Sequence, residues 1–184
     1  ISQIKNKERV AGFIGEIWGA CKIRNCVNMM TGNIMGGDEI GGFVGAWFVN
    51  SAYTSSSEPE NNLIENCTQS MLGNIVTYDK SGQIVGGFIG RCDLGTNDYE
   101  VGTIKNCILS MCGDIYANFW AGGFIGRNAP SDGASGGKWI INACRQEMHG
   151  NIGCCRSEGT SSSGAGGFVG AGRNIIYNSL LLMK

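Results

Sequence analysis

Short apolar phrases recur along this chain, separated by polar residues, and none has the spacing of an amphipathic helix. One phrase, Gly-Gly-Phe-Ile/Val-Gly or a close variant, occurs at 11–15, 41–45, 86–90, 122–126 and 166–170. A second phrase, Ile-x-Asn-Cys or a variant, follows each copy at 23–26, 64–67, 104–107, 141–144 and 176–179. Self-similarity of this kind is the signature of a repeat architecture.

The segment after the second phrase has a fixed length. Relative to the Cys or Ser that ends the phrase, the fixed positions are four residues on (Met30, Met71, Met111, Met148 and Met183), six on (Gly32, Gly73, Gly113 and Gly150) and eight on (Ile34, Ile75, Ile115 and Ile152). The alternate positions are polar, as in Arg145, Glu147 and His149. A period of two predicts β-strands, with the Cys, Met, Gly and Ile positions facing inward.

The remaining segments vary in length and are rich in Ser, Gly, Asp and Asn, which is typical of surface loops. These insertions are Asn50–Asn62, Cys92–Gly102, Asn128–Lys138 and Cys155–Gly166. Fixed strands between variable loops predict an all-β protein: one domain, residues 1–184, folded as a right-handed parallel β-solenoid, or β-helix. We expect five coils, at approximately 1–30, 31–71, 72–111, 112–148 and 149–184.

Stacked coils place equivalent inward residues above one another, about 4.8 Å apart. We therefore expect columns of Met and of Cys in the core. The Asn residues of the second phrase (Asn25, Asn66, Asn106 and Asn178) form a further column, which we expect to be a buried stack that satisfies its amides along the column. The residue before each Asn position suits an outward position; this set is Arg24, Glu65, Lys105, Asn142 and Tyr177.

The first phrase predicts an apolar stripe along one face. Its Phe and its Ile or Val have opposite parity, and the pattern alone does not decide which of them faces inward. With Phe inward, the outward set is Ile14, Val44, Ile89, Ile125 and Val169. Flanking glycines leave such a stripe bare, so we expect either a covering loop or a contact with another chain.

Composition and charge exclude several classes of protein. The chain has 31 glycines in 184 residues but only 2 prolines, and the glycines follow no triplet period, which excludes collagen. A net charge of −1 gives no electrostatic footprint for nucleic acid. The apolar stretches are far shorter than the ~18 residues of a membrane span. We therefore expect neither a nucleic-acid partner nor membrane insertion.

The phrases resemble the GLUG-motif repeats of adhesin-like surface proteins, in which a Gly-Gly-Leu-Val-Gly-like core precedes an Ile-x-Asn-Cys/Ser phrase and a Gly-Asn-Ile-like phrase. Here Phe replaces the Leu. The resemblance covers five copies and nearly the whole chain outside the loops. It implies attachment or scaffolding at an extracellular, cell or virion surface, although no signal peptide is visible. Since it brings no catalytic residues, we expect a non-catalytic module without a cofactor.

The cysteines admit two interpretations. Those in equivalent inward positions are small apolar fillers of a column, although coil stacking would also bring neighbours within disulfide range. Outside the column, Cys112 and His149 each follow a column Met, and with Cys154 and Cys155 they are a weak candidate for a Zn²⁺ site.

Carbohydrate chemistry is the runner-up function, as a carbohydrate-binding or carbohydrate-cleaving β-helix. Cleavage needs two carboxylates about 5–10 Å apart. The candidates in or beside the loops are Asp79, Asp93, Asp98, Glu100 and Asp132, and no pair is singled out by spacing.

The two ends stand at the same phase of the repeat. Ile4 lies nine residues before Phe13, as Ile34 does before Phe43, and Lys184 directly follows the last column Met. Unpaired strand edges at such ends predict strand addition. We expect copies of the chain to stack end to end through Ile1, Ile4, Met183 and Lys184 into a fibre, coat or filament, unless the chain is a slice of a longer array. A glycan or host surface is a further candidate partner.

Overall fold

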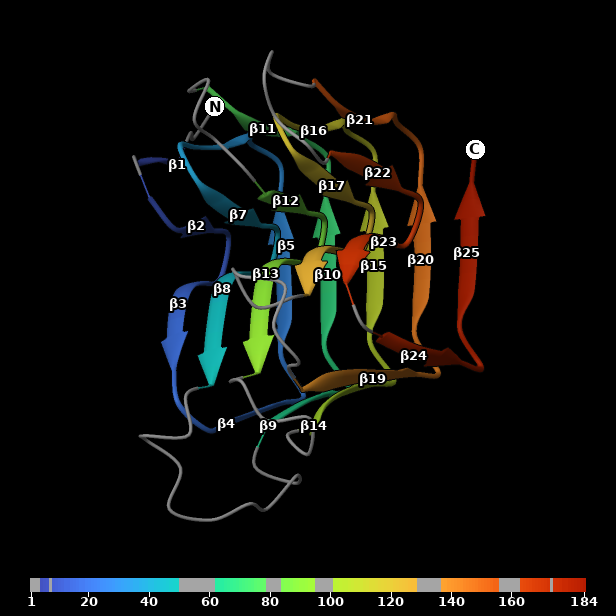
Figure 1. Cartoon of the computed structure of the whole chain (residues 1–184). Coiled ribbons are helices and arrows are strands. Elements are labelled where there is room, and N and C mark those ends of the chain that lie inside the picture. The colour runs from blue at the N-terminus through green and yellow to red at the C-terminus, as the bar shows by residue number, and fades with distance from the viewer. Residues whose placement is uncertain are drawn as a thin grey trace.

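The computed structural model describes residues 4–6, 8–49, 62–78, 84–94, 101–128, 137–155, 163–172 and 174–184. Within these ranges the regular structure is β-strand, and the strands form five sheets of five parallel strands each. Each strand pairs with the equivalent strand of the next coil, so the coils stack side by side (Figure 1). The predicted parallel β-solenoid of five coils is confirmed. In the part of the chain described, no helix could cross a membrane.

Three sheets carry the first part of every coil. Sheet A contains β1 (Ile4–Asn6), β6 (Ile34–Gly36), β11 (Ile75–Thr77), β16 (Ile115–Ala117) and β21 (Ile152–Cys154). Sheet B contains β2 (Val10–Ala11), β7 (Glu39–Gly41), β12 (Ile84–Gly86), β17 (Trp120–Gly122) and β22 (Gly164–Gly166). Sheet C contains β3 (Ile14–Trp18), β8 (Val44–Val49), β13 (Ile89–Leu94), β18 (Ile125–Asn128) and β23 (Val169–Gly172).

The other two sheets complete each coil. Sheet D contains β4 (Cys21–Arg24), β9 (Asn62–Glu65), β14 (Val101–Lys105), β19 (Lys138–Asn142) and β24 (Asn174–Tyr177). Sheet E contains β5 (Val27–Met30), β10 (Thr68–Met71), β15 (Ile108–Met111), β20 (Arg145–Met148) and β25 (Leu180–Met183), which stand in a row from blue to red in Figure 1. The predicted insertions fall largely outside the described residues, but Cys92 and Leu94 are strand residues of β13 rather than loop.

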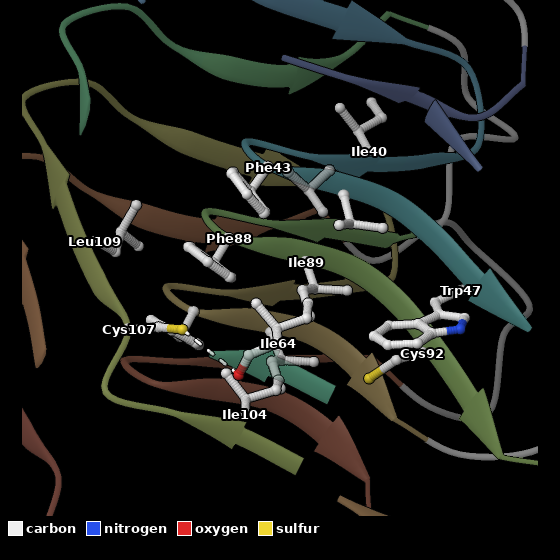
Figure 2. Close-up of a cluster of buried hydrophobic side chains, with 14 of the residues drawn as sticks. Ile40, Phe43, Trp47, Ile64, Phe88, Ile89, Cys92, Ile104, Cys107 and Leu109 are labelled. Carbon is white, nitrogen blue, oxygen red and sulfur yellow. Dashed lines mark hydrogen bonds between the residues drawn. The ribbon is translucent and has the colours of Figure 1, made fainter. Parts of the chain in front are cut away.

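The core consists of columns of identical or similar side chains. The five column Met residues pair in register along sheet E, and Met71, Met111 and Met148 are at most 1% exposed. The Phe rings of successive coils stack with centroids 4.7–4.9 Å apart. Figure 2 shows Phe43, Phe88 and Cys107 in the apolar interior. The predicted period of two in the strands of sheet E, with the Met and Cys positions facing inward, is therefore confirmed.

A corner between sheets D and E is formed by the Asn column. Asn25, Asn66, Asn106, Ala143 and Asn178 all have left-handed backbone conformations, with φ of 51–56°. Asn adopts this conformation more readily than most residues. Asn66 donates through Nδ2 to Oδ1 of Asn25 at 3.2 Å, and Asn106 does the same to Asn66. The predicted amide ladder is present, but the prediction that it is buried is wrong because the left-handed corner turns these side chains outward, where they are exposed.

Replacing a column Met tests which positions of sheet E face inward. Met111→Ala removes a fully buried side chain from the middle coil, so we expect a loss of ~2–5 kcal/mol in the free energy of unfolding. Glu147→Ala, at an outward position, should change stability little because its partners Arg145, His149 and Lys184 lie at the surface. Urea unfolding measures both, and equal losses would contradict the assignment.

Candidate functional site

The faces of the first and fifth coils expose side chains that are buried at the equivalent positions of the middle coils. In coil five, Met183 is 48% exposed and Ile176 is 45% exposed, whereas their register partners Met148 and Ile141 are completely buried. In coil one, Phe13 is 46% exposed, while Phe43 below it is completely buried. Among the described residues, no further coil packs on either face, so core-facing side chains lie exposed there.

The predicted end residues are only partly described. Ile1 lies outside the described residues. Ile4 is in β1 and pairs with Ile34, as its phase in the repeat predicts. Lys184 is exposed; its backbone N–H donates to the carbonyl of Met148, and its Nζ contacts Glu147 Oε1 at 2.7 Å. The structure thus places both described ends within the coil pattern.

Hydrogen bonds at the corners between sheets repeat from coil to coil. Besides the Asn corner ladder, a second ladder runs between sheets E and A. Asn33 Oδ1 accepts the backbone N–H of Asn74 at 2.8 Å, Asn74 Oδ1 accepts that of Asp114, and Asp114 Oδ1 accepts that of Asn151. Sequence reasoning missed this ladder, although a polar Asx residue seven positions after each Cys was its signal.

The predicted outward stripe is wrong. Val44, Ile89 and Ile125 are completely buried, and Ile14 and Val169, in the end coils, are half-buried. The Phe residues of the middle coils are buried as well. The cause is a bend, because β7 ends at Gly41 and β8 begins at Val44, so Gly42 and Phe43 form the corner between sheets B and C. Strand alternation does not continue across a corner, and both apolar residues face the core. Lateral contact through this stripe is therefore not available.

The predicted metal site is not assembled. Cys112 and His149 follow paired Met residues on neighbouring coils, and both are exposed. Cys154, however, lies in sheet A beside Ala117, and Cys155 follows it. His149 Nε2 instead lies 3.3 Å from Glu147 Oε1. In the described ranges, no three His, Cys, Asp or Glu side chains are grouped as a metal site would require.

The carboxylate candidates for carbohydrate chemistry are represented by Asp93 alone, since Asp79, Asp98, Glu100 and Asp132 lie outside the described residues. Asp93 accepts a hydrogen bond from Arg91 Nε at 2.8 Å. Burial raises the pKa of Asp93 despite this attraction. Its described surroundings are those of a largely buried, ion-paired residue of sheet C rather than of a pair of catalytic carboxylates.

Asp93 belongs to a charged cluster that crosses three coils on the outside of sheets B and C. Arg91 also donates from Nη1 to Glu39 Oε1 at 2.8 Å, and Arg9 donates from Nε to Glu39 Oε2 at 3.2 Å. The Phe48 ring lies 5.0 Å from the Arg9 guanidinium and 5.2 Å from that of Arg91. Sequence reasoning missed this cluster. Its signal was a charged residue directly after three of the five glycine phrases, at Glu16, Arg91 and Arg127.

The column cysteines form no disulfides with one another in the structure. All nine cysteines have free thiols in the structure, including the stacked set Cys26, Cys67, Cys107 and Cys144. The last three of these are at most 1% exposed, which agrees with their role as fillers. Ser179 takes the same position in coil five, and its hydroxyl accepts the backbone N–H of Cys144 at 3.2 Å.

These features define a parallel β-solenoid of five stacked coils. Searches with the sequence and the structure found no matching family model, no matching curated protein and no matching solved structure.

Proposed function

We propose that this chain is a non-catalytic structural or adhesive β-solenoid module whose copies stack end to end into a filament or coat. The observation that carries the proposal is the exposure of core-facing side chains on coil five, where Leu181 and Met183 are 37% and 48% exposed. Exposed apolar surface of this kind usually marks a contact surface. A resemblance to repeats of surface proteins supports the same class of function and an extracellular or virion-surface location.

A second copy is the occupant that fits this face. Coil one presents the same columns as coil five, so Phe13 of one copy would lie on Phe168 of the next and continue the ring stack. Met30 would lie on Met183 in the same way. The backbone edges of β1–β5 and β21–β25 would pair as the strands inside the chain already do, by strand addition.

The Asn corner ladder also fits this stacking. Within the chain, the Nδ2 of each later Asn donates to the Oδ1 of an earlier one, as Asn66 does to Asn25. Asn178 likewise donates through Nδ2 to an earlier coil, to Asn142 Oδ1 at 3.4 Å, so by the same repeat its Oδ1 would accept from a following coil. The Asn25 Nδ2 of a second copy supplies a donor for that oxygen. A head-to-tail contact of this kind is heterologous and repeats without closing, so it produces a filament.

The test changes the core-facing residues of β25 and leaves its outer residues as the control. Leu181→Lys with Met183→Lys places two charges on the coil-five face, and we expect filaments to be lost because a lysine buried without a partner is costly. Leu180→Lys with Leu182→Lys alters the same strand on its outward side, opposite Arg145 and Glu147, and should leave assembly intact. Sedimentation velocity and electron microscopy measure the outcome.

The expected filament has an axial repeat of about 24 Å, the height of five coils spaced about 4.8 Å apart. Monodisperse monomers of the unaltered chain, or equal loss of assembly in the two variants, would contradict the proposal. Circular dichroism of each variant shows whether the solenoid itself is retained.

A further inference from the structure

The outer face of sheet E carries a patch of exposed apolar side chains. The five strands stand side by side and form one face of the solenoid (Figure 1). The exposed large apolar residues at its outward positions are Val27, Met29, Leu72, Ile108 and Leu180. Met29, at 78%, is the most exposed large apolar residue in the described part of the chain. An apolar patch of this kind usually marks a contact surface.

Three rows of outward residues cross this face in register. The first row is Val27, Thr68, Ile108, Arg145 and Leu180. The second row is Met29, Ser70, Ser110, Glu147 and Leu182. The third row consists of the residues directly after the column Met residues: Thr31, Leu72, Cys112, His149 and Lys184. The charged residues of these rows all belong to coils four and five, so coils one to three present an uncharged surface.

A two-fold axis parallel to the strands and passing over β15 makes this face complementary to itself. Such an axis keeps the strand direction and reverses the order of the coils. Strand β5 of one copy then lies over β25 of the other, and β10 lies over β20. Val27 faces Leu180, and Met29 faces Leu182. Ile108 faces the same residue of the second copy, so apolar residues meet at the centre and at both ends of the face.

The charged residues meet hydroxyl groups in the same arrangement. The facing pairs are Arg145 with Thr68, Glu147 with Ser70, and Lys184 with Thr31. A hydroxyl group donates to a carboxylate and accepts from a cation, so each of these pairs is able to form a hydrogen bond. Leu72 faces His149, which offers the apolar body of its ring. A surface that matches itself about a two-fold axis is what a symmetric contact between two copies requires.

The opposite orientation is disfavoured by the charge pattern. A two-fold axis along the solenoid would place each coil on the same coil of the second copy and reverse the strand direction. Glu147 would then face Glu147, and Arg145 would face His149. Like charges directly opposite one another are destabilising. The reversed order of coils is therefore the arrangement that the charges support.

We propose that sheet E is a lateral interface on which a second copy of this chain packs face to face, with its coils in the opposite order. The face is about 24 Å wide across five strands and about 16 Å long over five residues. This area is smaller than the ~800 Å² that each partner buries in a standard interface. Two single chains therefore pair weakly, whereas copies stacked end to end repeat the contact and pair more firmly.

Chemical cross-linking through Cys112 tests the position of the axis, because Cys112 is the third-row residue that faces itself. The background variant carries Cys155→Ser, which leaves Cys112 as the exposed thiol. A short bis-maleimide is used because sheets packed face to face lie about 10 Å apart. Gel electrophoresis measures the rate of covalent dimer formation, and mass spectrometry identifies the linked residues.

Leu72→Cys and His149→Cys, each combined with Cys112→Ser, are matched controls from the same row. We expect the background to form dimers at least about 10-fold faster than either control alone, because pairing gives its two thiols a high effective concentration. In each control the equivalent thiol of the second copy lies two coils away. A mixture of the two controls should link as fast as the background, since position 72 faces position 149. Equal rates for the three proteins alone would contradict the proposal.

Ile108→Asp should abolish the fast linkage, because it places two carboxylates opposite each other near the axis. Tyr116→Asp is its control, since Tyr116 is similarly exposed in the same coil but lies on sheet A. Circular dichroism shows whether both variants keep the solenoid, as surface changes should allow. Equal linkage in the two variants would overturn the proposal.

The lysine variants of β25 distinguish this lateral contact from end-to-end stacking. Leu181→Lys with Met183→Lys removes filaments but should keep selective linkage at Cys112. Leu180→Lys with Leu182→Lys keeps filaments but should slow the linkage, because lysines then face Val27 and Met29. Unchanged linkage in this outward variant would overturn the lateral contact and leave the axial one standing.

Discussion

Gly87→Ala should prevent the middle coils from stacking. A Cβ atom at this position would lie 2.1 Å from the carbonyl oxygen of Gly123 in the next coil and 2.7 Å from the Leu109 side chain. This oxygen is a backbone atom of the neighbouring coil, so it cannot move without separating the two coils. Overpacking of a rigid core usually costs 1–3 kcal/mol, and a clash with backbone costs more. We expect a loss of more than about 4 kcal/mol, measured by urea unfolding.

Gly167→Ala is the matched control for this change. It occupies the same position of the phrase in coil five, but its added Cβ would meet only the end of the Leu181 side chain, at 2.8 Å. A flexible side chain at an open face can move, so we expect a small loss of stability. A comparable loss for Gly167→Ala would show that the glycines are required by the corner itself and not by the spacing of the coils.

This comparison also shows why the repeat could be predicted from the sequence. Where backbone approaches backbone in every coil, only glycine fits, so glycine must return at the same phase. The Met column is equally constrained, because a side chain at Met71 packs between those at Met30 and Met111. Because stacked positions need the same type of residue in every coil, that residue recurs along the sequence. This recurrence predicts the fold class and the register of sheet E.

The orientation of the glycine phrase could not be predicted because alternation holds only within a strand. No residue pattern distinguishes a strand of five residues from two strands that meet at a corner. The glycine pair was the available signal, since Gly42 and Gly87 both approach a backbone oxygen of the next coil. Without coordinates, however, Gly-Gly is equally compatible with a bare outward stripe.

The repeat pattern also could not predict which polar side chains are buried. Gln69 and Gln146 are completely buried at inward positions of sheet E, in the same column as Leu109. Gln69 accepts a hydrogen bond from Asn28 at 2.8 Å, and Gln146 donates to Gly167 O at 2.7 Å. Which polar side chain finds a partner inside a column depends on contacts between different sheets, which the repeat period does not encode.

Arg91→Leu should destabilise the solenoid strongly because Arg91 is a largely buried member of the charged cluster on the outer side of sheets B and C. Its guanidinium donates hydrogen bonds to both Glu39, which is 2% exposed, and Asp93. Removing one member of a buried ion pair typically costs 3–5 kcal/mol, so we expect a loss of about 3 kcal/mol at pH 7. Arg145→Leu, which breaks the exposed pair with Glu147, should cost less than about 1 kcal/mol.

The loss in Arg91→Leu should depend on pH. Burial already holds the pKa of Asp93 above its usual value, and removing the guanidinium raises it further. A carboxyl group whose pKa is higher in the folded than in the unfolded state stabilises the fold while protonated, and this stabilisation is lost as pH rises through the folded pKa. Acidification should therefore restore part of the stability of the variant, and Asp93→Asn in the same background should restore it at pH 7. Urea unfolding at several pH values measures both effects, and a loss in Arg91→Leu that is no greater than in Arg145→Leu would show that the cluster contributes nothing to the stacking of the coils.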